Sequence, residues 1–342
     1  MVRPIRALAS RFHRPHDPDA MNAPSHTPLQ VQPPAASPGA SPHAARHPAT
    51  DSGALPPQAV LLQVVLCATW GLGQVAMKLG NEGISPVWQA ALRSAGATLL
   101  LLAWIAWRRI PVWRGDGTLA PGLLAGALFG IEFALLYTGL LWTNASRAAV
   151  LLYTSPFFVA LGAHWFVPGD RLNRRKLVGL AAAFAGVVLA FGDRGGAAQP
   201  NALIGDLMCL GAAVLWAATT IVLKTTPLRS APPEKNLLYQ LGVSALLMAA
   251  LSTLLGERGV FAPSAFVWGL LAFQTVIVAL ASYLAWFWMV SRYRASTLHA
   301  FTFLTPLFGV FFGAVLLGEP VGARLIASLA LIAGGIVLVN RS

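Results

Sequence analysis

Two charged residues lie deep inside long apolar segments and are the side chains best placed to do chemistry. Arg93 falls in the apolar segment 84–106 and Glu132 in the segment 119–142. A charge at the centre of a membrane helix costs between about 2.5 and more than 10 kcal/mol, depending on the scale used. At 1.5 Å per residue, both lie roughly 15 Å from the same membrane surface. We expect them to face each other as an ion pair, either fixed or exchanging partners with a proton or a cationic substrate group.

Aromatic residues accompany these charges at related positions. Trp70 and Gln74 are one helical turn apart, and Trp216 and Thr220 repeat that spacing 146 residues later. A cavity lined by aromatic rings with few polar groups suits an amphipathic organic solute, whereas packing of the same rings in a helical core is the competing interpretation. The predicted substrate cavity is lined by Trp70, Gln74, Arg93, Glu132, Tyr137, Tyr153, Trp216, Thr220, Gln240, Tyr283, Trp286 and His299.

One histidine and two prolines complete the candidate site. His299 titrates in the physiological range, so it is interpreted either as a proton relay or substrate contact, or as an interior histidine with satisfied hydrogen bonds. Pro156 and Pro306 each remove one helix hydrogen bond and are predicted to kink the segments 145–166 and 295–317. Paired helix breaks at corresponding positions of two repeats point to a transport site.

The composition requires a membrane around these segments. Of the 342 residues, 56% are hydrophobic and 11% are charged, whereas a soluble chain has about 25% charged residues. The net charge of +12 is spread over short loops rather than gathered on one face, which argues against nucleic acid as a partner. The apolar runs are continuous, which argues against an outer-membrane barrel.

The sequence contains none of the motifs that would indicate an enzyme. No GxxxxGK[ST] loop occurs, so the chain carries no ATP-driven motor of its own. Cys67 and Cys209 lie in apolar runs and have neither disulfide nor metal spacing. Glu132 and His299 would form a hydrolytic pair only beside an activated nucleophile, and the sequence supplies none. We therefore expect no enzymatic activity, no metal and no cofactor.

The chain divides into a tail and ten predicted membrane helices. Residues 1–57 are rich in proline, lack an apolar run and are predicted to be disordered, and Met21 is an alternative start. The remaining apolar runs are long enough to span the hydrocarbon core as helices. They cover approximately residues 58–79, 84–106, 119–142, 145–166, 173–192, 204–224, 235–256, 264–291, 295–317 and 321–340. In one of them Gly122, Gly126 and Gly130 are four residues apart and predict close helix packing.

The Lys and Arg residues orient these helices. With the N-terminus in the cytoplasm, the inner side carries 18 Lys and Arg, including those of the tail, and the outer side carries five. This bias predicts that both termini are cytoplasmic. Asp206 is predicted to cap its own helix, and Lys78, Lys224 and Glu319 are placed at helix ends within reach of the membrane surface.

Residues 58–192 and 193–342 are predicted to be two repeats of five helices each. Because five is odd, the second repeat enters the membrane with opposite polarity, and inverted repeats of this kind are a transporter architecture. The counterparts of Arg93 and Glu132 are the neutral residues Gln240 and Val278, so both charges are absent from the second repeat. Five residue pairs recur in order at offsets of 146 to 150: Trp70 and Trp216, Pro86 and Pro233, Tyr137 and Tyr283, Pro156 and Pro306, Gly186 and Gly335.

Several stretches resemble a known family. The Trp-x7-Lys ends of the first and sixth segments, ISPVWQAALRS at 84–94 and TNASRAAVLLYTSPFFVALGA at 143–163 look like the EamA-type members of the drug/metabolite transporter superfamily. The resemblance covers residues 58–340 and implies ten helices, an inverted pseudo-twofold and a central cavity. It also implies transport of small metabolites, amino acids or drugs, often outward. The chain departs from the family pattern at 168–172, where PGDRL replaces a Gly-Glu pair that Gly318 and Glu319 keep in the second repeat.

These observations predict an all-α integral membrane protein that works as a secondary transporter. It is expected to export a small organic metabolite across the inner membrane by alternating access, as a monomer or homodimer in the lipid bilayer. The energy source stays open between proton coupling through Glu132 or His299, exchange, and facilitated diffusion. An integral-membrane enzyme or a non-transporting scaffold is the alternative.

Overall fold

The computed structural model describes residues 55–113, 115–166, 172–192, 201–293, 298, 301–302 and 304–340. Within these ranges the chain is helical, and the β pairing is limited to one isolated antiparallel bridge between Ile84 and Val260. The predicted disordered tail lies outside the described residues except for its last three positions. His299 also lies outside them, so its predicted role is untested.

The helices follow the predicted apolar segments closely. Seven segments of the described chain are long and apolar enough to cross a membrane, and Leu304–Leu317 and Ala323–Leu338 are shorter apolar helices. The count of ten spans stays a prediction. The elements are α1 Pro57–Gly80, α2 Pro86–Arg108, α3 Leu119–Gly139, α4 Ala145–Leu152, α5 Ser155–Phe166, α6 Arg174–Gly192, α7 Ala202–Thr225, the 3₁₀ turn η1 Pro227–Ser230, α8 Pro233–Leu254, α9 Ala265–Ala272, the π-helix η2 Phe273–Ala281, α10 Ser282–Arg292, α12 Leu304–Leu317 and α13 Ala323–Asn340.

Two of the predicted segments are interrupted. Between α4 and α5, Tyr153 and Thr154 leave the α-helical path, and Pro156 is the second residue of the new helix, where its missing N–H costs nothing. The long segment from Ala265 to Arg292 winds as a π-helix over residues 273–281. Pro306 is the third residue of α12 and also lies in a first helical turn.

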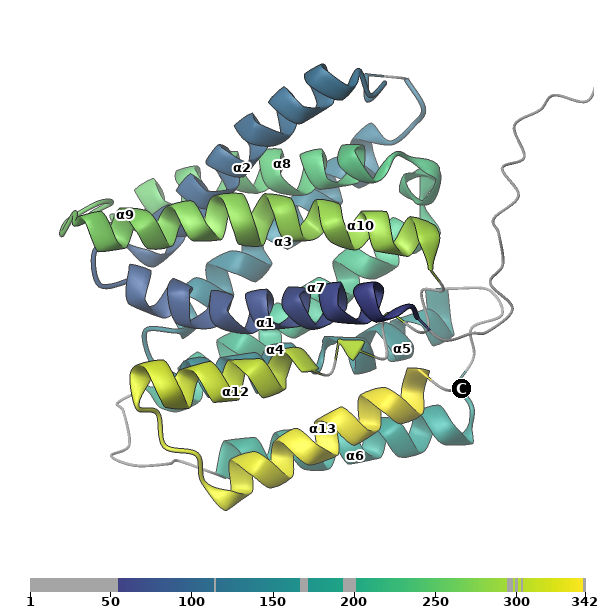
Figure 1. The fold of residues 1–342 in the computed structure, drawn as a ribbon, viewed down its shortest axis with the longest axis vertical. Helices are drawn as coiled ribbons and strands as arrows, with labels where there is room; N and C mark the ends of the chain where they lie inside the picture. The colour runs from purple at the N-terminus through teal and green to yellow at the C-terminus, as the bar shows by residue number, and fades with distance from the viewer. Residues whose placement is uncertain are drawn as a thin grey trace, which may run out of the picture. The chain divides into compact units, whose positions relative to one another are not determined.

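Helices of residues 58–192, called here the first half, pack against helices of residues 193–342, called the second half. The helix α2 packs on α8, and α6 packs on α13 at one edge of the helical unit (Figure 1). The helix α1 packs on α12, and correspondingly α4 and α5 pack on α7. The helix α3 packs on α7 and α8, and correspondingly α1 and α2 pack on α9 and η2. These contacts between the halves therefore match one another under exchange of the two halves.

Glycines allow the closest of these approaches. Gly122, Gly126 and Gly130 recur every fourth residue on α3 and face α8. A Cβ atom on Gly126 would lie 2.5 Å from the Tyr239 carbonyl oxygen and from the Val243 Cβ atom. The sequence predicts close helix packing at these glycines, and the structure confirms it.

The helical unit has two ends that are used below as reference points. The Lys78 end is where α1 ends and α2 begins, and the Arg108 end is where α2 ends and α3 begins. At the Arg108 end, the guanidinium of Arg108 lies 5.5 Å from the Trp104 ring centroid, and that of Arg292 lies 4.6 Å from the Trp288 ring centroid. Such Trp and Arg pairs are typical of a membrane surface.

Candidate functional site

Arg93 lies in the middle of α2 and is 1% exposed. Its guanidinium carbon sits 3.9 Å from the centroid of the Phe133 ring and 5.9 Å from that of the Tyr137 ring, both on α3. Its Nε and Nη2 atoms have no hydrogen-bond partner among the described residues. A buried guanidinium stacked on aromatic rings thus keeps two N–H groups without an acceptor, which is costly for a structural residue.

Glu132 lies on α3 beside this arginine and is 3% exposed. It interacts electrostatically with Arg93, yet the described residues form no Arg93–Glu132 ion pair within 4.0 Å, and the Glu132 Oε2 atom has no hydrogen-bond partner there. The two buried charges therefore interact with each other as predicted, but not through a direct ion pair. Successive residues of an α-helix point about 100° apart, so a guanidinium stacked on Phe133 is turned away from the carboxylate of the preceding residue.

A hydrogen-bonded network that includes Tyr137, the neighbour of Arg93, joins four helices. The Tyr137 hydroxyl donates to Gln274 Oε1 over 2.5 Å, and Gln89 Nε2 approaches the same oxygen at 3.3 Å. Gln274 Nε2 donates to the carbonyl of Ala76 over 3.1 Å. Gln274 belongs to the π-helix η2, and π-helical turns are frequent at functional sites. We call Arg93, Glu132, Phe133, Tyr137 and Gln274 the central cluster.

The predicted aromatic lining falls into two groups. Trp70 on α1 packs against Tyr283 and Trp286 on α10, with ring centroids 6.4 and 5.7 Å apart, and its indole N–H donates to the Ser282 hydroxyl over 2.8 Å. The other group is a pair across the halves, since Tyr153 meets the Trp216 ring edge-on at 5.4 Å.

These aromatic groups adjoin the central cluster. Tyr283 interacts electrostatically with Arg93, Glu132 and Tyr137, and Tyr153 interacts in the same way with Tyr283. Residues of both halves therefore meet around the two buried charges.

The remaining predicted residues have more local contacts. Gln74 is buried, and its Oε1 atom has no partner among the described residues. Gln240 and Thr220 donate to carbonyls of their own helices, at Asn236 and Trp216. Gln89, Gln274 and Ser282 were not predicted. The two glutamines could have been predicted from the sequence, because a glutamine within an apolar span must find a hydrogen-bond partner for its amide.

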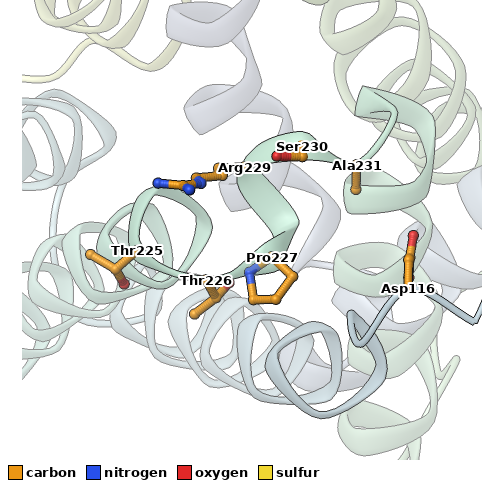
Figure 2. Close-up of a pocket in the computed structure, with 7 residues that line it drawn as sticks. All are labelled: Asp116, Thr225, Thr226, Pro227, Arg229, Ser230 and Ala231. Carbon is orange, nitrogen blue, oxygen red and sulfur yellow. The ribbon is translucent and has the colours of Figure 1, made fainter. Parts of the chain in front are cut away.

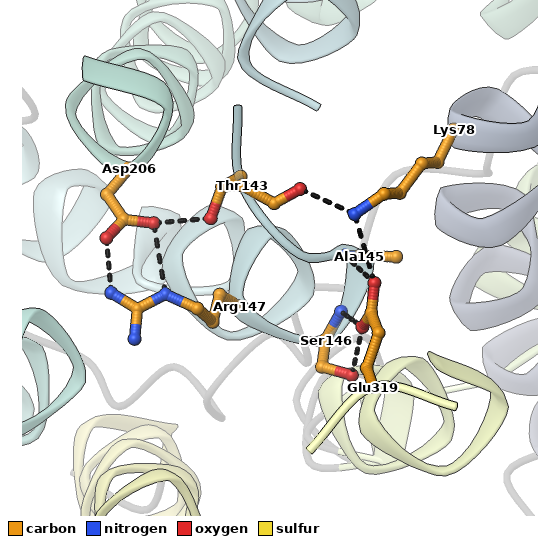
Figure 3. A network of polar contacts seen from close by, with 7 residues as sticks. All are labelled: Lys78, Thr143, Ala145, Ser146, Arg147, Asp206 and Glu319. Carbon is orange, nitrogen blue, oxygen red and sulfur yellow. Dashed lines mark hydrogen bonds and ion pairs between the residues drawn. The ribbon is translucent and has the colours of Figure 1, made fainter. Parts of the chain in front are cut away.

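A second polar network closes the Lys78 end (Figure 3). Glu319, which follows α12, accepts hydrogen bonds from the backbone N–H groups of Ala145 and Ser146 at 2.7 and 2.8 Å and from the Ser146 hydroxyl at 2.6 Å. The Lys78 ammonium lies 3.3 Å from Glu319 Oε1 and donates to the Thr143 carbonyl over 2.8 Å. The carboxylate thus occupies the N-terminus of α4, where unpaired N–H groups and the helix dipole favour an anion.

Asp206 joins the same network rather than capping its own helix. It forms an ion pair with Arg147 and accepts a hydrogen bond from the Thr143 hydroxyl over 2.6 Å. Because α7 begins four residues before Asp206, at Ala202, the carboxylate has already passed the first turn and points toward α4 instead. The capping prediction is therefore wrong. Thr143 links the two ion pairs, since its hydroxyl contacts Asp206 and its carbonyl contacts Lys78 (Figure 3).

A third carboxylate at this end holds the N-terminus of α2. Glu257 accepts hydrogen bonds from the backbone N–H groups of Val87 and Trp88 at 3.1 and 2.9 Å and from the Ser252 hydroxyl at 2.6 Å. Glu257, Glu319 and Asp206 all belong to the second half, and the helix N-termini and the arginine that they bind belong to the first. We call these three residues and their partners the Lys78-end network.

The Arg108 end carries a smaller polar contact. Lys235 on α8 donates to both oxygens of Asp116, in the α2–α3 loop, over 2.9 Å. The hydrogen bond from the Thr118 hydroxyl, followed by the contact with Lys235, lowers the pKa of the Asp116 carboxyl from 3.8 to about 2. A cavity of about 410 Å³ opens beside Asp116 (Figure 2), and its other lining residues are Thr225, Thr226, Pro227, Arg229, Ser230 and Ala231. This cavity contains no residue of the central cluster.

Comparison with known proteins gives this geometry a context. The EamA-like transporter family matches the chain twice, over residues 57–192 and 203–341. The chain is 26% identical over 277 residues to the uncharacterized transporter YoaV of Bacillus subtilis, across 79% of this chain and 92% of that protein. It is 28% identical over 287 residues to a probable amino-acid metabolite efflux pump of Salmonella typhimurium, across 81% of this chain and 93% of that protein.

The fold also has a counterpart among solved structures. A crystal structure with 21% sequence identity superposes with a TM-score of 0.59, covering 82% of this chain and 97% of that chain. At this level of identity the likeness concerns the fold alone.

Proposed function

From the premise that the chain belongs to the EamA-like transporter family, we propose that it is a secondary transporter that exports a small organic metabolite across the inner membrane. That the protein is a multi-pass membrane transporter follows from the family and from its apolar helices. The class of solute, the direction and the mechanism are proposals. The solute is an amphipathic compound of amino-acid or related metabolite size.

The central cluster carries this proposal. Charges within membrane-spanning segments almost always face a helix-bundle interior or a water-filled path, because lipid does not solvate them. Arg93 and Glu132 are both buried without forming an ion pair, and Arg93 Nε, Arg93 Nη2 and Glu132 Oε2 lack hydrogen-bond partners among the described residues. Aromatic side chains of both halves surround them. This arrangement suits a site that binds a polar, partly aromatic solute in transit.

The paired contacts between the halves support an inverted-repeat architecture. We propose ten transmembrane helices, with residues 58–192 and 193–342 as two five-helix repeats of opposite polarity. The packing of α2 on α8, of α4 on α12 and of α6 on α13 joins counterparts, and the packing of α3 on α7 and α8 is matched by that of α1 and α2 on α9 and η2. Rocking one repeat against the other would expose the central cluster alternately to each side of the membrane.

The Lys78-end network is the proposed outer gate. The excess of Lys and Arg in the opposite loops supports an orientation with the Lys78 end outside and both termini in the cytoplasm. The contacts of Glu257, Glu319 and Asp206 join the second half to the first, so opening this end requires that they break. The energy source is proton coupling through Glu132 or His299, exchange or facilitated diffusion.

Transport by the full chain in proteoliposomes tests this function. Vesicles are loaded with labelled amino acids and amphipathic metabolites, and the release of each solute is compared with that from protein-free vesicles. We expect one or a few solutes to exchange faster than in protein-free vesicles. The double variant R93Q/E132Q should exchange them at least tenfold more slowly than the unaltered chain. The variant E82Q, an exposed glutamate near the Lys78 end, should exchange normally. If no solute leaves faster than from protein-free vesicles, the proposed function is refuted.

A further inference from the structure

We propose that the cavity at the Arg108 end binds the headgroup of an anionic phospholipid that carries hydroxyl groups, with the phosphate on Arg229 and the hydroxyls on Asp116 and the neighbouring threonines. Phosphatidylglycerol is the simplest lipid of this chemistry. The cavity contains no residue of the central cluster, so the inference goes beyond the proposed function and requires no transported solute. It adds a ligand that belongs to the membrane itself.

The cavity lies at the membrane surface and has walls from both halves. It measures about 410 Å³, and Asp116 of the α2–α3 loop forms one wall (Figure 2). The other lining residues come from the end of α7 and from η1 with its flanking residues. The Trp and Arg pairs of this end indicate the level at which phospholipid headgroups lie. A lipid headgroup is therefore always at hand beside the cavity.

Arg229 supplies the attraction for a phosphate. Its side chain is exposed and lines the cavity, and its guanidinium has no ion-pair partner among the described residues. The planar guanidinium matches two oxygens of a phosphate in a bidentate arrangement. In Figure 2, Arg229 and Asp116 lie on opposite sides of Pro227. The arginine is thus available to a ligand rather than to this carboxylate.

The charge balance favours an anion. Both carboxylate oxygens of Asp116 accept from the Lys235 ammonium over 2.9 Å. The hydrogen bond from Thr118 and the contact with Lys235 lower the pKa of Asp116 to about 2, so the ion pair persists at neutral pH. The positive charge of Arg229 is then the charge of the lining that lacks a counter-ion in the described structure. A phospholipid with one negative charge compensates it, whereas a zwitterionic lipid brings a further positive charge.

The rest of the lining offers hydrogen-bond acceptors. The Thr225 and Thr226 hydroxyls donate to the carbonyls four residues earlier in the chain, over 2.8 and 2.7 Å. A hydroxyl has one hydrogen and two lone pairs, so both groups can only accept from a ligand. Asp116 Oδ2 accepts from Lys235, and a carboxylate oxygen accepts more than one hydrogen bond. The hydroxyls of a glycerol headgroup donate to such oxygens, whereas a bare phosphate has nothing to donate.

Other basic residues of this end attract anionic lipids without touching the cavity. Arg108, Arg109 and Lys224 are exposed, and none of them lines it. Their charges raise the local concentration of anionic lipid near the surface. General attraction and specific contact therefore come from different residues, and Arg108 offers a matched control for Arg229.

Three lipids with identical short acyl chains test the inference on the purified full chain in detergent. Dihexanoyl phosphatidylglycerol carries the negative charge and the hydroxyls, its phosphatidylethanol analogue carries the charge alone, and its phosphatidylcholine analogue carries no net charge. Binding is measured by native mass spectrometry and by the rise in the unfolding midpoint. We expect phosphatidylglycerol to bind most tightly and phosphatidylcholine least. Binding of either analogue as tight as that of phosphatidylglycerol would overturn the proposal.

Variants at exposed positions locate the site. R229Q should weaken the binding of phosphatidylglycerol by about tenfold, because a charge-assisted contact is lost. R108Q, which changes an exposed arginine of the same end outside the cavity, should bind like the unaltered chain. T225V removes one acceptor and should narrow the difference between phosphatidylglycerol and phosphatidylethanol. Equal losses in R229Q and R108Q would reduce the effect to general surface attraction and overturn the site.

Glycerol 3-phosphate distinguishes a lipid from a free phosphate ester with the same chemistry. Weak displacement of phosphatidylglycerol by glycerol 3-phosphate would support the lipid, and displacement at equal concentration would overturn the lipid as the ligand. Neither measurement involves transport. Failure of lipid binding would leave the proposed function standing, and a lack of solute exchange in proteoliposomes would leave the lipid site standing.

Discussion

The Lys78-end network and the central cluster differ in how many partners their buried charges have. At the Lys78 end, Glu319 has two backbone N–H groups, a hydroxyl and an ammonium around its carboxylate, and Asp206 has an arginine and a hydroxyl. In the central cluster, Arg93 and Glu132 retain atoms without partners among the described residues. The first arrangement stabilises a conformation. The second is unfavourable for the fold alone and is understandable where a solute supplies the missing partners.

Removal of the Glu319 charge should have the largest effect on stability. The variant E319Q places an amide where the N–H groups of Ala145 and Ser146 need an anion, and it leaves Lys78 without its counter-ion. Breaking a buried pair of this kind costs about 3 kcal/mol. We expect a clearly lower unfolding midpoint of the detergent-purified protein, whereas E82Q should unfold like the unaltered chain. A midpoint for E319Q equal to that of E82Q would contradict this role of the network.

The Asp206–Arg147 pair should give a smaller, coupled effect. The single variants D206N and R147Q each leave one partner buried, while D206N/R147Q removes both charges. Coupling between contacting charges of this kind is typically about 1–2 kcal/mol. A double-mutant cycle of unfolding free energies measures it directly. Simple additivity of the two single effects would show that the ion pair does not act as a unit.

Lys78 should contribute least among the charges at this end. Its side chain is 24% exposed, and Glu319 keeps three other donors when the lysine is replaced. Partly exposed ion pairs contribute about 0–1 kcal/mol. We expect K78Q to shift the unfolding midpoint much less than E319Q. A shift as large as that of E319Q would mean that the ammonium, rather than the N-terminus of α4, is the main partner of the carboxylate.

The stabilising contribution of the Asp116–Lys235 ion pair at the Arg108 end should change in acid and stay constant near neutral pH. The pKa of Asp116 is lowered to about 2, so its stabilising contribution is complete above its ordinary value of 3.8 and is lost as the pH falls toward about 2. The difference in unfolding midpoint between the unaltered protein and D116N should therefore be constant above pH 5 and shrink below pH 4. A difference that stays constant down to pH 2.5 would contradict the assigned partners.

Much of the fold could be predicted from the sequence, because membrane helices are recognisable by the length and hydrophobicity of their segments. The all-α membrane class is confirmed by the apolar helices and the family match, and the resemblance to EamA-type transporters is confirmed by the same match. The glycines Gly122, Gly126 and Gly130 were correctly interpreted because a small residue every fourth position marks a helix contact whatever the partner.

The side-chain partners were harder to predict, for two physical reasons. The depth of Arg93 and Glu132 follows from residue counting, but the direction in which each points depends on the rotation of its helix, which packing decides. Glu319 and Lys78 contact each other although they are 241 residues apart in the chain. No local sequence pattern predicts a contact over that separation. Gln274 was missed because its side chain is uncharged, although a glutamine inside an apolar span also needs a hydrogen-bond partner.

The unfolding midpoint of the ligand-free double variant R93Q/E132Q, measured beside E319Q, tests most directly whether the central charges serve a solute rather than the fold. Neutral amides in place of two incompletely partnered buried charges should leave the midpoint unchanged or raise it, while E319Q lowers it. A drop in R93Q/E132Q as large as that in E319Q would show that the central charges hold the helices together, and would contradict the account.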